Sequence, residues 1–391
     1  MAGWRALDRG VSAWFDTPSL SAGAALVRRI AELGEGLPDI DLRAGGVRVR
    51  VGSAELAGAI SAAAGELGLV ADPAALQTVR LGIDVVDRAS IVPFWRQVLG
   101  YEPVDGDGLE DPLRREPAIG FHQADRQRPL RNRIHVDVSR VAEAVRSAKD
   151  SVGAEAYGAY GLTIADAEGN EIDLVPGGEL PGGQQTADWR TLFGAMTFYP
   201  ITSPAQAGEF ASVTAALADE AGIPLLVDLR PAGVAIDSGK DQWEDGERSD
   251  GGRFADLAGR IQTAARDRGY AADPARLRFV QLGIDAVDVA AVRAFWTSVL
   301  GYRHDPRTHL TDIYDPRRLN PVLFVQGMDP AEEDRRRQRN RIHLDLLVPA
   351  DQVRARVDAA LAAGGRVVAA PAPDRQTIAD PEGNEVTVCS C

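Results

Sequence analysis

Two short stretches of the sequence carry a cation, an imidazole and a carboxylate at alternating positions. Successive side chains of a β-strand point to opposite faces, so each trio would lie on one face of a strand. Burying a polar group costs roughly 2 to 7 kcal/mol unless the group is paired, which argues against a dry core there. Each face is therefore expected to line a wet cavity. The trios are Arg133, His135 and Asp137 in "RNRIHVDVS" and Arg341, His343 and Asp345 in "RNRIHLDLLV".

A second pair of strings adds carboxylates with the same orientation. "IADAEGNEIDLV" begins at Ile164 and "IADPEGNEVTVC" begins at Ile378, and each predicts a strand, a Gly-containing turn and a last strand. On that last strand Glu171, or Glu385 in the second string, shares a face with the residue two positions further on. Each last strand is therefore expected to add a carboxylate to the wall of such a cavity.

These strings belong to an internal repeat whose unit is about half the chain. "LGIDVVDRASIVPFWRQVLGY" from Leu81 returns as "LGIDAVDVAAVRAFWTSVLGY" from Leu282. Further upstream, "DLRAGGVRV" from Asp41 returns more weakly as "DLRPAGVAI" from Asp228. The second copy gains short insertions, which are expected in loops. A duplicated fold must therefore position the two trios.

Each copy predicts a helix directly after its first strand. Apolar residues recur at helical spacing between an Asp that can cap the N-terminus and a Gly that can end the helix. Pro93 falls inside the first helix only and predicts a kink there. Short strands, the strand with the trio and a second helix follow. The cap and stop residues are Asp87 and Gly100 in the first copy and Asp288 and Gly301 in the second.

Composition limits the class of protein. The chain has 391 residues, 45% of them hydrophobic, and a formal net charge of -14, with no basic stripe to neutralise nucleic-acid phosphates. No apolar run reaches the length of a membrane span, and no secretory signal is recognised. The only cysteines, Cys389 and Cys391, are too close together for a useful disulfide. We expect a cytoplasmic globular protein that binds neither nucleic acid nor membrane.

Together these strings resemble the glyoxalase-like domains of the vicinal oxygen chelate superfamily. The resemblance rests on the β-α-β-β-β order, the tryptophan-bearing helix, the "NRIHLDL" strand and the "DPEGNE" ending, and covers residues 78–176 and 278–391. In that family two βαβββ modules pair into a cupped sheet around a site, with metal ligands on the first and last strands of each module. The resemblance implies an α+β fold with two glyoxalase-like units of paired βαβββ modules.

The segments that precede these units resemble pterin-4a-carbinolamine dehydratase, a small α+β fold. The resemblance rests on "PDIDLRAGGVRVRV" and the helical pattern after it. That family carries a His-His-Pro motif, of which only the proline remains here. Without an imidazole to move the proton, we expect no dehydratase activity and a structural or dimerising role, which makes a homodimer one expectation. The matching residues are Gly36, Leu37 and Pro38 in the first copy and Gly222, Ile223 and Pro224 in the second.

The two resemblances divide the chain into four predicted domains, with the same pair of folds occurring twice. The predicted domains are a dehydratase-like module over residues 1–76, a glyoxalase-like domain over 77–178, a second dehydratase-like module over 186–276 and a second glyoxalase-like domain over 277–391.

Carried over position by position, the resemblance implies four metal-ligand places in each copy. The second set can donate oxygen or nitrogen to a divalent cation and suits Zn, Fe, Ni, Co or Mn better than Mg. The first set begins with Arg80, and an arginine cannot ligate a metal. His122 would replace its neighbour Gln123 if the strand register differed by one. The sets are Gln281, Gln326, His343 and Glu385 in the second copy and Arg80, Gln123, His135 and Glu171 in the degenerate first copy.

Arg133 and Arg341 are predicted to point into the cup with the histidines. A guanidinium there suits a carboxylate, phosphate or enolate oxygen of a bound substrate, and Asp137 is a further candidate for substrate contact. The alternative is that these arginines pair with Asp137 or Glu171 and hold the wall of the cup together.

The leading functional interpretation is action on a small oxygenated molecule. A divalent metal in the second glyoxalase-like domain would polarise vicinal oxygens while Glu385 or Asp345 moves a proton, in isomerase, lyase or oxygenase chemistry. Two alternatives stay open. One is a metal-free protein that sequesters a small molecule, as resistance members of the superfamily do, and the other is an interaction scaffold. The sequence does not decide whether the protein is an enzyme.

Overall fold

The structure, a computed structural model, describes residues 3–390 except 9, 35, 105, 107, 245–251, 370, 371 and 373. Cys391 therefore lies outside the described residues. The chain forms two compact units, and both repeats contribute to each of them. No helix in the described part is long and apolar enough to cross a membrane. Unit 1 comprises Met1–Leu76, Arg140–Ala142 and Pro176–Phe279, and unit 2 comprises Gln77–Ser139, Glu143–Val175 and Val280–Cys391.

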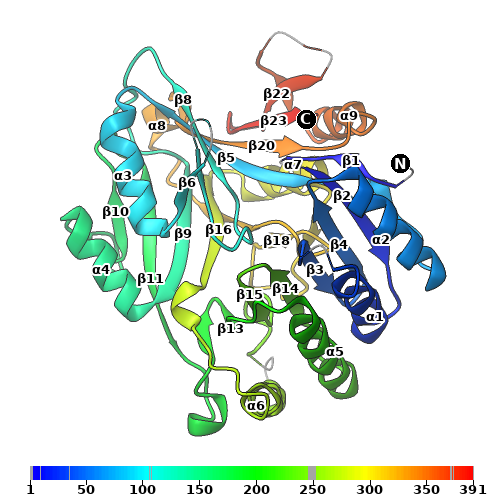
Figure 1. Cartoon of the computed structure of the whole chain (residues 1–391). Helices are drawn as coiled ribbons and strands as arrows, with labels where there is room; N and C mark the ends of the chain where they lie inside the picture. The colour runs from blue at the N-terminus through cyan, green and yellow to red at the C-terminus, as the bar shows by residue number, and fades with distance from the viewer. Residues whose placement is uncertain are drawn as a thin grey trace. The chain divides into compact units, whose positions relative to one another are not determined.

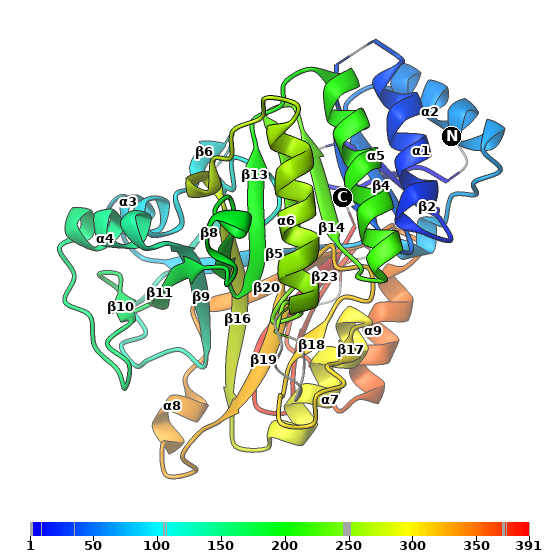
Figure 2. The same cartoon turned by 90° about the horizontal axis from the view of Figure 1, so that it is seen from below.

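Unit 1 is an antiparallel sheet with helices packed on one face (Figures 1 and 2). Its strand order is β1-β2-β4-β3-β14-β15-β13-β12. The strands are β1 Arg5–Ala6, β2 Val11–Asp16, β3 Asp39–Arg43, β4 Gly46–Val51, β12 Arg190–Leu192, β13 Gly194–Tyr199, β14 Leu226–Arg230 and β15 Gly233–Asp237. The helices are α1 Leu20–Ala31, α2 Ala54–Glu66, α5 Pro204–Ala221 and α6 Gly252–Arg266, with short 3-10 turns at Pro73–Ala75, Gly183–Thr186 and Pro274–Arg276.

Unit 1 repeats one arrangement of elements. The order β2-α1-β3-β4-α2 recurs as β13-α5-β14-β15-α6, and the repeats join where β3 pairs with β14. Serine side chains start the first helix of each repeat, since Ser19 accepts from Ala22 N and Ser203 from Gln206 N. Gly222 ends α5 with a left-handed φ of 64°, a conformation that glycine adopts at little cost.

A buried network of charges lies where β3 and β14 meet. Asp41 and Asp228 face each other in register, and each forms an ion pair with an arginine of the opposite strand. Arg230 Nη2 lies 2.6 Å from Asp41 Oδ1, and Arg43 Nη1 lies 2.7 Å from Asp228 Oδ1. Arg48 Nε donates to the other oxygen of Asp41 at 2.6 Å. Burial raises the pKa of Asp41, but the charges of Arg230, Arg48 and Arg43 outweigh it and hold that pKa well below its usual value.

Unit 1 is expected to lose stability in acid because of Asp41. A carboxyl group whose pKa is lowered by folding stabilises the fold above its unfolded value, here 3.8, and this contribution is lost as the pH falls through the folded pKa. Asp41→Asn should remove this contribution, so the variant's unfolding free energy should vary less with pH below 3.8. Denaturant unfolding of both proteins over that pH range is the measurement. Equal pH slopes would contradict the prediction.

Unit 2 contains two sheets. One has the order β21-β22-β23-β20-β5-β8-β7-β6, and in the other β11-β9-β16-β19-β18-β17 are neighbours, with β10 on β11. The first copy supplies β5 Thr78–Val85, α3 Arg88–Leu99, β6 Glu102–Val104, β7 Gly108–Glu110, β8 Ile119–Gln123, β9 Ile134–Val141, α4 Ala142–Val152, β10 Thr163–Ala165 and β11 Glu171–Glu179. The second copy supplies β16 Arg278–Ala286, α7 Val289–Leu300, β17 Arg303–His304, β18 Ile313–Tyr314, β19 Val322–Gly327, α8 Glu333–Arg337, β20 Ile342–Leu347, α9 Val353–Ala362, β21 Arg366–Val367, β22 Arg375–Ala379 and β23 Glu385–Cys389.

The two copies exchange strands between these sheets. In the first sheet β5 and β8 of the first copy join β20 and β23 of the second, with His343 opposite Gly82 (Figure 1). In the second sheet β16 and β19 join β9 and β11. Segments 77–178 and 277–391 therefore each supply part of both sheets. The two copies have nearly the same strand pattern. The sequence pattern alone therefore does not determine whether a strand pairs within its own copy or with the other copy.

The predicted ends of the first helix in each copy are confirmed. Asp87 accepts from Ala89 N at 3.1 Å to start α3, and Asp288 accepts from Ala291 N at 3.0 Å to start α7. Both helices end at a glycine with φ near 65°, a conformation that costs a residue with a side chain more. Trp95 and Trp296, at equivalent positions of the two helices, are fully buried in the core of unit 2.

Candidate functional site

One face of the β5-containing sheet gathers polar side chains, while the opposite face packs into the apolar core. The registers place Gly82 beside Gly120 and opposite His343, and Arg80 opposite Asp345. Apolar neighbours such as Leu81 alternate with them and lie in the core. The polar face carries Arg80 and Asp84 from β5, His122 from β8, His343 and Asp345 from β20, and Glu385 and Thr387 from β23.

His122, His343 and Asp345 converge on this face, and we call them the His122 site. Each offers one ligand atom, and these atoms all lie within 4.8 Å of one another. His122 Nε2 is 4.0 Å from Asp345 Oδ2, and the two imidazole ring centroids are 5.2 Å apart. Tetrahedral ligands at about 2.1 Å from one ion lie about 3.4 Å apart, so a small closing movement of His122 and Asp345 would let them share a cation.

The polar atoms of the His122 site have no protein partners to satisfy them. His122 Nε2, His343 Nδ1 and Asp345 Oδ1 are buried and accept or donate no hydrogen bond among the described residues. A buried polar atom left without a partner costs about 1 to 3 kcal/mol, so three at one point indicate a place prepared for a ligand. His343 is 8% exposed, so its imidazole is largely withdrawn from solvent.

Gly82 makes room for the His343 imidazole. A Cβ atom at this position would lie 2.2 Å from His343 Nε2, closer than any real contact allows. Only glycine at this point of β5 therefore lets the ring lie against the sheet. Burial lowers the pKa of His122, and the neighbouring His343 lowers it further, while Asp345 and Asp84 act in the opposite direction.

The pseudo-equivalent face of the other sheet holds His135, Asp137 and Gln281, which we call the His135 site. Gln281 Nε2 donates to Asp137 Oδ2 at 3.0 Å, and His135 Nε2 lies 3.5 Å from Asp137 Oδ1. The His135 ring lies over Gly283 as His343 lies over Gly82, and its edge meets Phe324. With an amide in place of a second imidazole, this site offers a weaker set of metal ligands.

The predicted metal-ligand quartet of the second copy is divided by the strand exchange. His343 and Glu385 lie in the β5-containing sheet, whereas Gln281 and Gln326 lie on β16 and β19 of the other sheet. Gln326 is exposed and donates to Asp285 Oδ1 at 2.6 Å. Arg80, which begins the degenerate first set, lies on the same sheet face as His343 of the second set.

The predicted ligand Gln123 gives way to its neighbour His122. In the observed register His122 pairs with Asp84, so its side chain points to the polar face. Gln123 points the other way, is exposed and donates to the backbone oxygens of Val86 and Ala124. The alternative register considered from the sequence is the one that the structure has.

Arg133 and Arg341, predicted to contact substrate, are buried, and their guanidinium groups donate to acceptors within the protein. Arg341 is 2% exposed and donates to Asn170 Oδ1 at 2.8 Å and to the backbone oxygens of Gly169 and Leu130. Arg133, 1% exposed, makes the equivalent bond to Asn384 Oδ1 at 3.0 Å. Their guanidinium groups satisfy partners within the protein and hold its wall together.

The remaining residues of the two RNR strings complete that framework. Asn132 Oδ1 accepts from Arg341 N and Asn340 Oδ1 accepts from Arg133 N, so each asparagine joins the two copies. Asn170 in turn donates to Asp166, which also accepts from Trp95 Nε1 at 2.9 Å. The second copy repeats these bonds with Asn384, Asp380 and Trp296. The recurring strings are therefore largely structural.

The two predicted carboxylates on the last strands are held by exposed arginines. Both oxygens of Glu385 accept from Arg339, at 2.7 and 2.8 Å. Glu171 pairs with Arg131 and accepts from the hydroxyl of Tyr157 at 2.8 Å. Of the two residues predicted to be catalytic, Glu385 is occupied by Arg339, whereas Asp345 belongs to the His122 site.

The chain is similar to one family of known domains and to several solved structures. A family model described as a glyoxalase-like domain matches residues 80–175 and 281–389. No curated protein matches the chain. Similar solved structures include glyoxalase I from Zea mays, 11% identical with a TM-score of 0.37 over 80% of this chain and 93% of that chain. Another is a glyoxalase/bleomycin resistance protein from Albidiferax ferrireducens T118, 15% identical with a TM-score of 0.22 over 28% of this chain and 94% of that chain.

Proposed function

Because the chain belongs to the glyoxalase-like domain family, we propose that it acts on a small oxygenated molecule through a divalent cation held by His122, His343 and Asp345. The observation that carries the proposal is the convergence of two imidazoles and one carboxylate on a polar sheet face, with ligand atoms that all lie within 4.8 Å of one another. Two imidazoles and one carboxylate suit Zn, Fe, Co, Ni or Mn better than Mg.

The chain's own residues would provide three ligands and leave further positions for substrate. A bound divalent cation supplies Lewis acidity toward vicinal oxygens of the substrate. The His343 ring packs against Gly82, which fixes its position. The His122 side chain is partly exposed, so the site is open to solvent. Glu385 would have to leave Arg339 before it could take a proton, since both of its oxygens are engaged. Asp345 needs no such rearrangement.

A second candidate function is metal-free binding of a small molecule in the same place. The observation that favours it is Arg80, whose strand position opposite Asp345 adds a positive charge to the face. A cation bound there must overcome that charge, whereas an anionic or oxygen-rich ligand would gain from it. Interaction with imidazoles and a guanidinium requires no metal.

The cation proposal is tested by zinc titration of chelator-treated full-length protein. We expect one equivalent per chain, with an affinity about tenfold lower in Asp345→Asn, because the amide lacks the carboxylate's charge. Asp137→Asn makes the same change at the His135 site and should leave that affinity unchanged. A wild-type protein that binds no zinc, or equal losses in the two variants, would exclude the proposed cation site. In the first case, binding of a small organic ligand would then support the metal-free alternative.

A further inference from the structure

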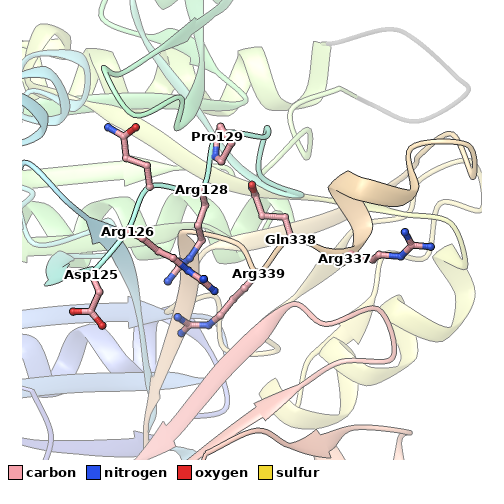
Figure 3. Close-up of a pocket in the computed structure, with 8 residues that line it drawn as sticks. Asp125, Arg126, Arg128, Pro129, Arg337, Gln338 and Arg339 are labelled. Atoms are coloured by element: carbon pink, nitrogen blue, oxygen red, sulfur yellow. The ribbon is translucent and has the colours of Figure 1, made fainter.

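A pocket lined largely by arginine opens in unit 2 beside the His122 site. Its cavity volume is about 840 Å³, and it lies between the loop after β8 and the segment after α8 (Figure 3). Figure 3 shows the guanidinium groups of Arg126, Arg128 and Arg339 gathered together, whereas Arg337 points away from them. The lining residues, which we call the arginine pocket, are Asp125, Arg126, Gln127, Arg128, Pro129, Arg337, Gln338 and Arg339.

These arginines differ in how far the protein already satisfies them. Arg339 is fully engaged, with three donors directed to Glu385 and Asp84. Arg128 uses only Nη1, which donates to Asp84 Oδ2 at 2.7 Å and to a backbone oxygen. Arg126 takes part in no hydrogen bond or ion pair within the described part of the chain. The pocket therefore presents unused guanidinium donors from Arg126 and Arg128.

The charge balance within the pocket favours an anion. Four arginines line the pocket, whereas the nearby carboxylates are three: Asp125 in its wall, Asp84, which pairs with Arg128 and Arg339, and Glu385, which pairs with Arg339. Like charges in one pocket repel each other unless something neutralises them. The chain as a whole has a net charge of -14, which makes a cluster of positive charge here an exception. A guanidinium pair binds planar carboxylate or phosphate oxygens with paired hydrogen bonds.

We propose that the arginine pocket binds the anionic group, carboxylate or phosphate, of a small molecule. Asp84 connects the pocket to the His122 site, because it pairs in register with His122 on the neighbouring strand. A ligand anchored by its anionic group would therefore reach the three ligand atoms with its other end. This last step rests on the proposed function and identifies the substrate class as an oxygenated small acid or phosphate ester.

The test is calorimetric titration of chelator-treated full-length protein with inorganic phosphate and, separately, with malonate. We expect one binding event per chain with at least one of the two anions, and the tighter of them identifies the group. Arg126→Gln should weaken it about tenfold, or about 1.4 kcal/mol, since it removes a charge with no partner to lose. Arg354→Gln removes the same charge from a side chain that is 93% exposed and outside the pocket, and should leave the affinity unchanged.

Three results would overturn the anion site: no binding of either anion, undiminished binding in Arg126→Gln, or an equal loss in Arg354→Gln. Zinc titration of Arg126→Gln keeps this inference separate from the proposed function. Unchanged zinc affinity with reduced anion affinity supports the pocket. If the protein binds an anion but no zinc, the anion site is supported and only the proposed cation site is excluded.

Discussion

Replacing Arg341 with alanine is expected to lower the free energy of unfolding by about 3 to 5 kcal/mol. The guanidinium is almost fully buried and donates to Asn170 Oδ1 and to the backbone oxygens of Leu130 and Gly169. Its removal leaves these acceptors without a donor and opens a cavity. The loss should be large because a hydrogen bond from a charged donor contributes about 1.5 to 3 kcal/mol.

Denaturant unfolding of the full-length variant measures this effect. Arg354→Ala is the matched control, because its side chain is 93% exposed and its ion pair with Asp358 is accessible to water. The control should change the unfolding free energy by no more than about 0.5 kcal/mol. A cost below about 1 kcal/mol for Arg341→Ala would show that the framework role is misassigned and would return Arg341 to the candidates for substrate contact.

Replacing Gly82 with valine is expected to weaken zinc binding about 100-fold, the upper end of what a change behind a ligand produces. A Cβ atom at Gly82 would lie 2.2 Å from His343 Nε2, so the imidazole must move out of its place. No ligand atom is removed by this substitution. A loss of zinc affinity in Gly82→Val would therefore result from displacement of the His343 ring, because glycine itself provides no ligand atom.

Gly283→Val provides the matched control for this experiment. A Cβ atom there would lie 2.2 Å from His135 Nε2, so the same strain is imposed on the His135 site. Both variants should lose a similar 1 to 3 kcal/mol or so of stability from overpacking, but only Gly82→Val should lose zinc. Equal zinc affinities in the two variants, measured by titration at a temperature where both are folded, would exclude His343 as a ligand.

Local features were predictable from the sequence because local chemistry determines them. Helix ends at Asp87 and Gly100 follow from a side chain that accepts a backbone hydrogen bond and a residue free to adopt positive φ. The common face of His343 and Asp345 follows from the two-residue period of a strand. The glyoxalase-like α+β class likewise follows from the order of such elements.

The composition of the site was not predictable, because it depends on which strands pair. Gln281 and His343 belong to one copy, yet the exchange places them in different sheets. A shift of one residue in the register of β8 exchanges Gln123 for His122, and no local signal fixes that register. Arg133 finds its partner Asn384 251 positions away, so its structural role is visible only in the folded chain.

The exchange of strands has a consequence for the order in which the protein can fold during synthesis. β5, Thr78–Val85, is translated well before its partner β20, Ile342–Leu347. Until then the edge of β5 that receives β20 has unpaired backbone groups, and such an edge is open to association with other chains. Pairing across so long a separation also makes folding slow. The chain loses the entropy of closing the loop before the strand contacts can stabilise it. A chain interrupted before β20 would leave the β5-containing sheet with only the strands of the first copy, and the His122 site with one of its three residues.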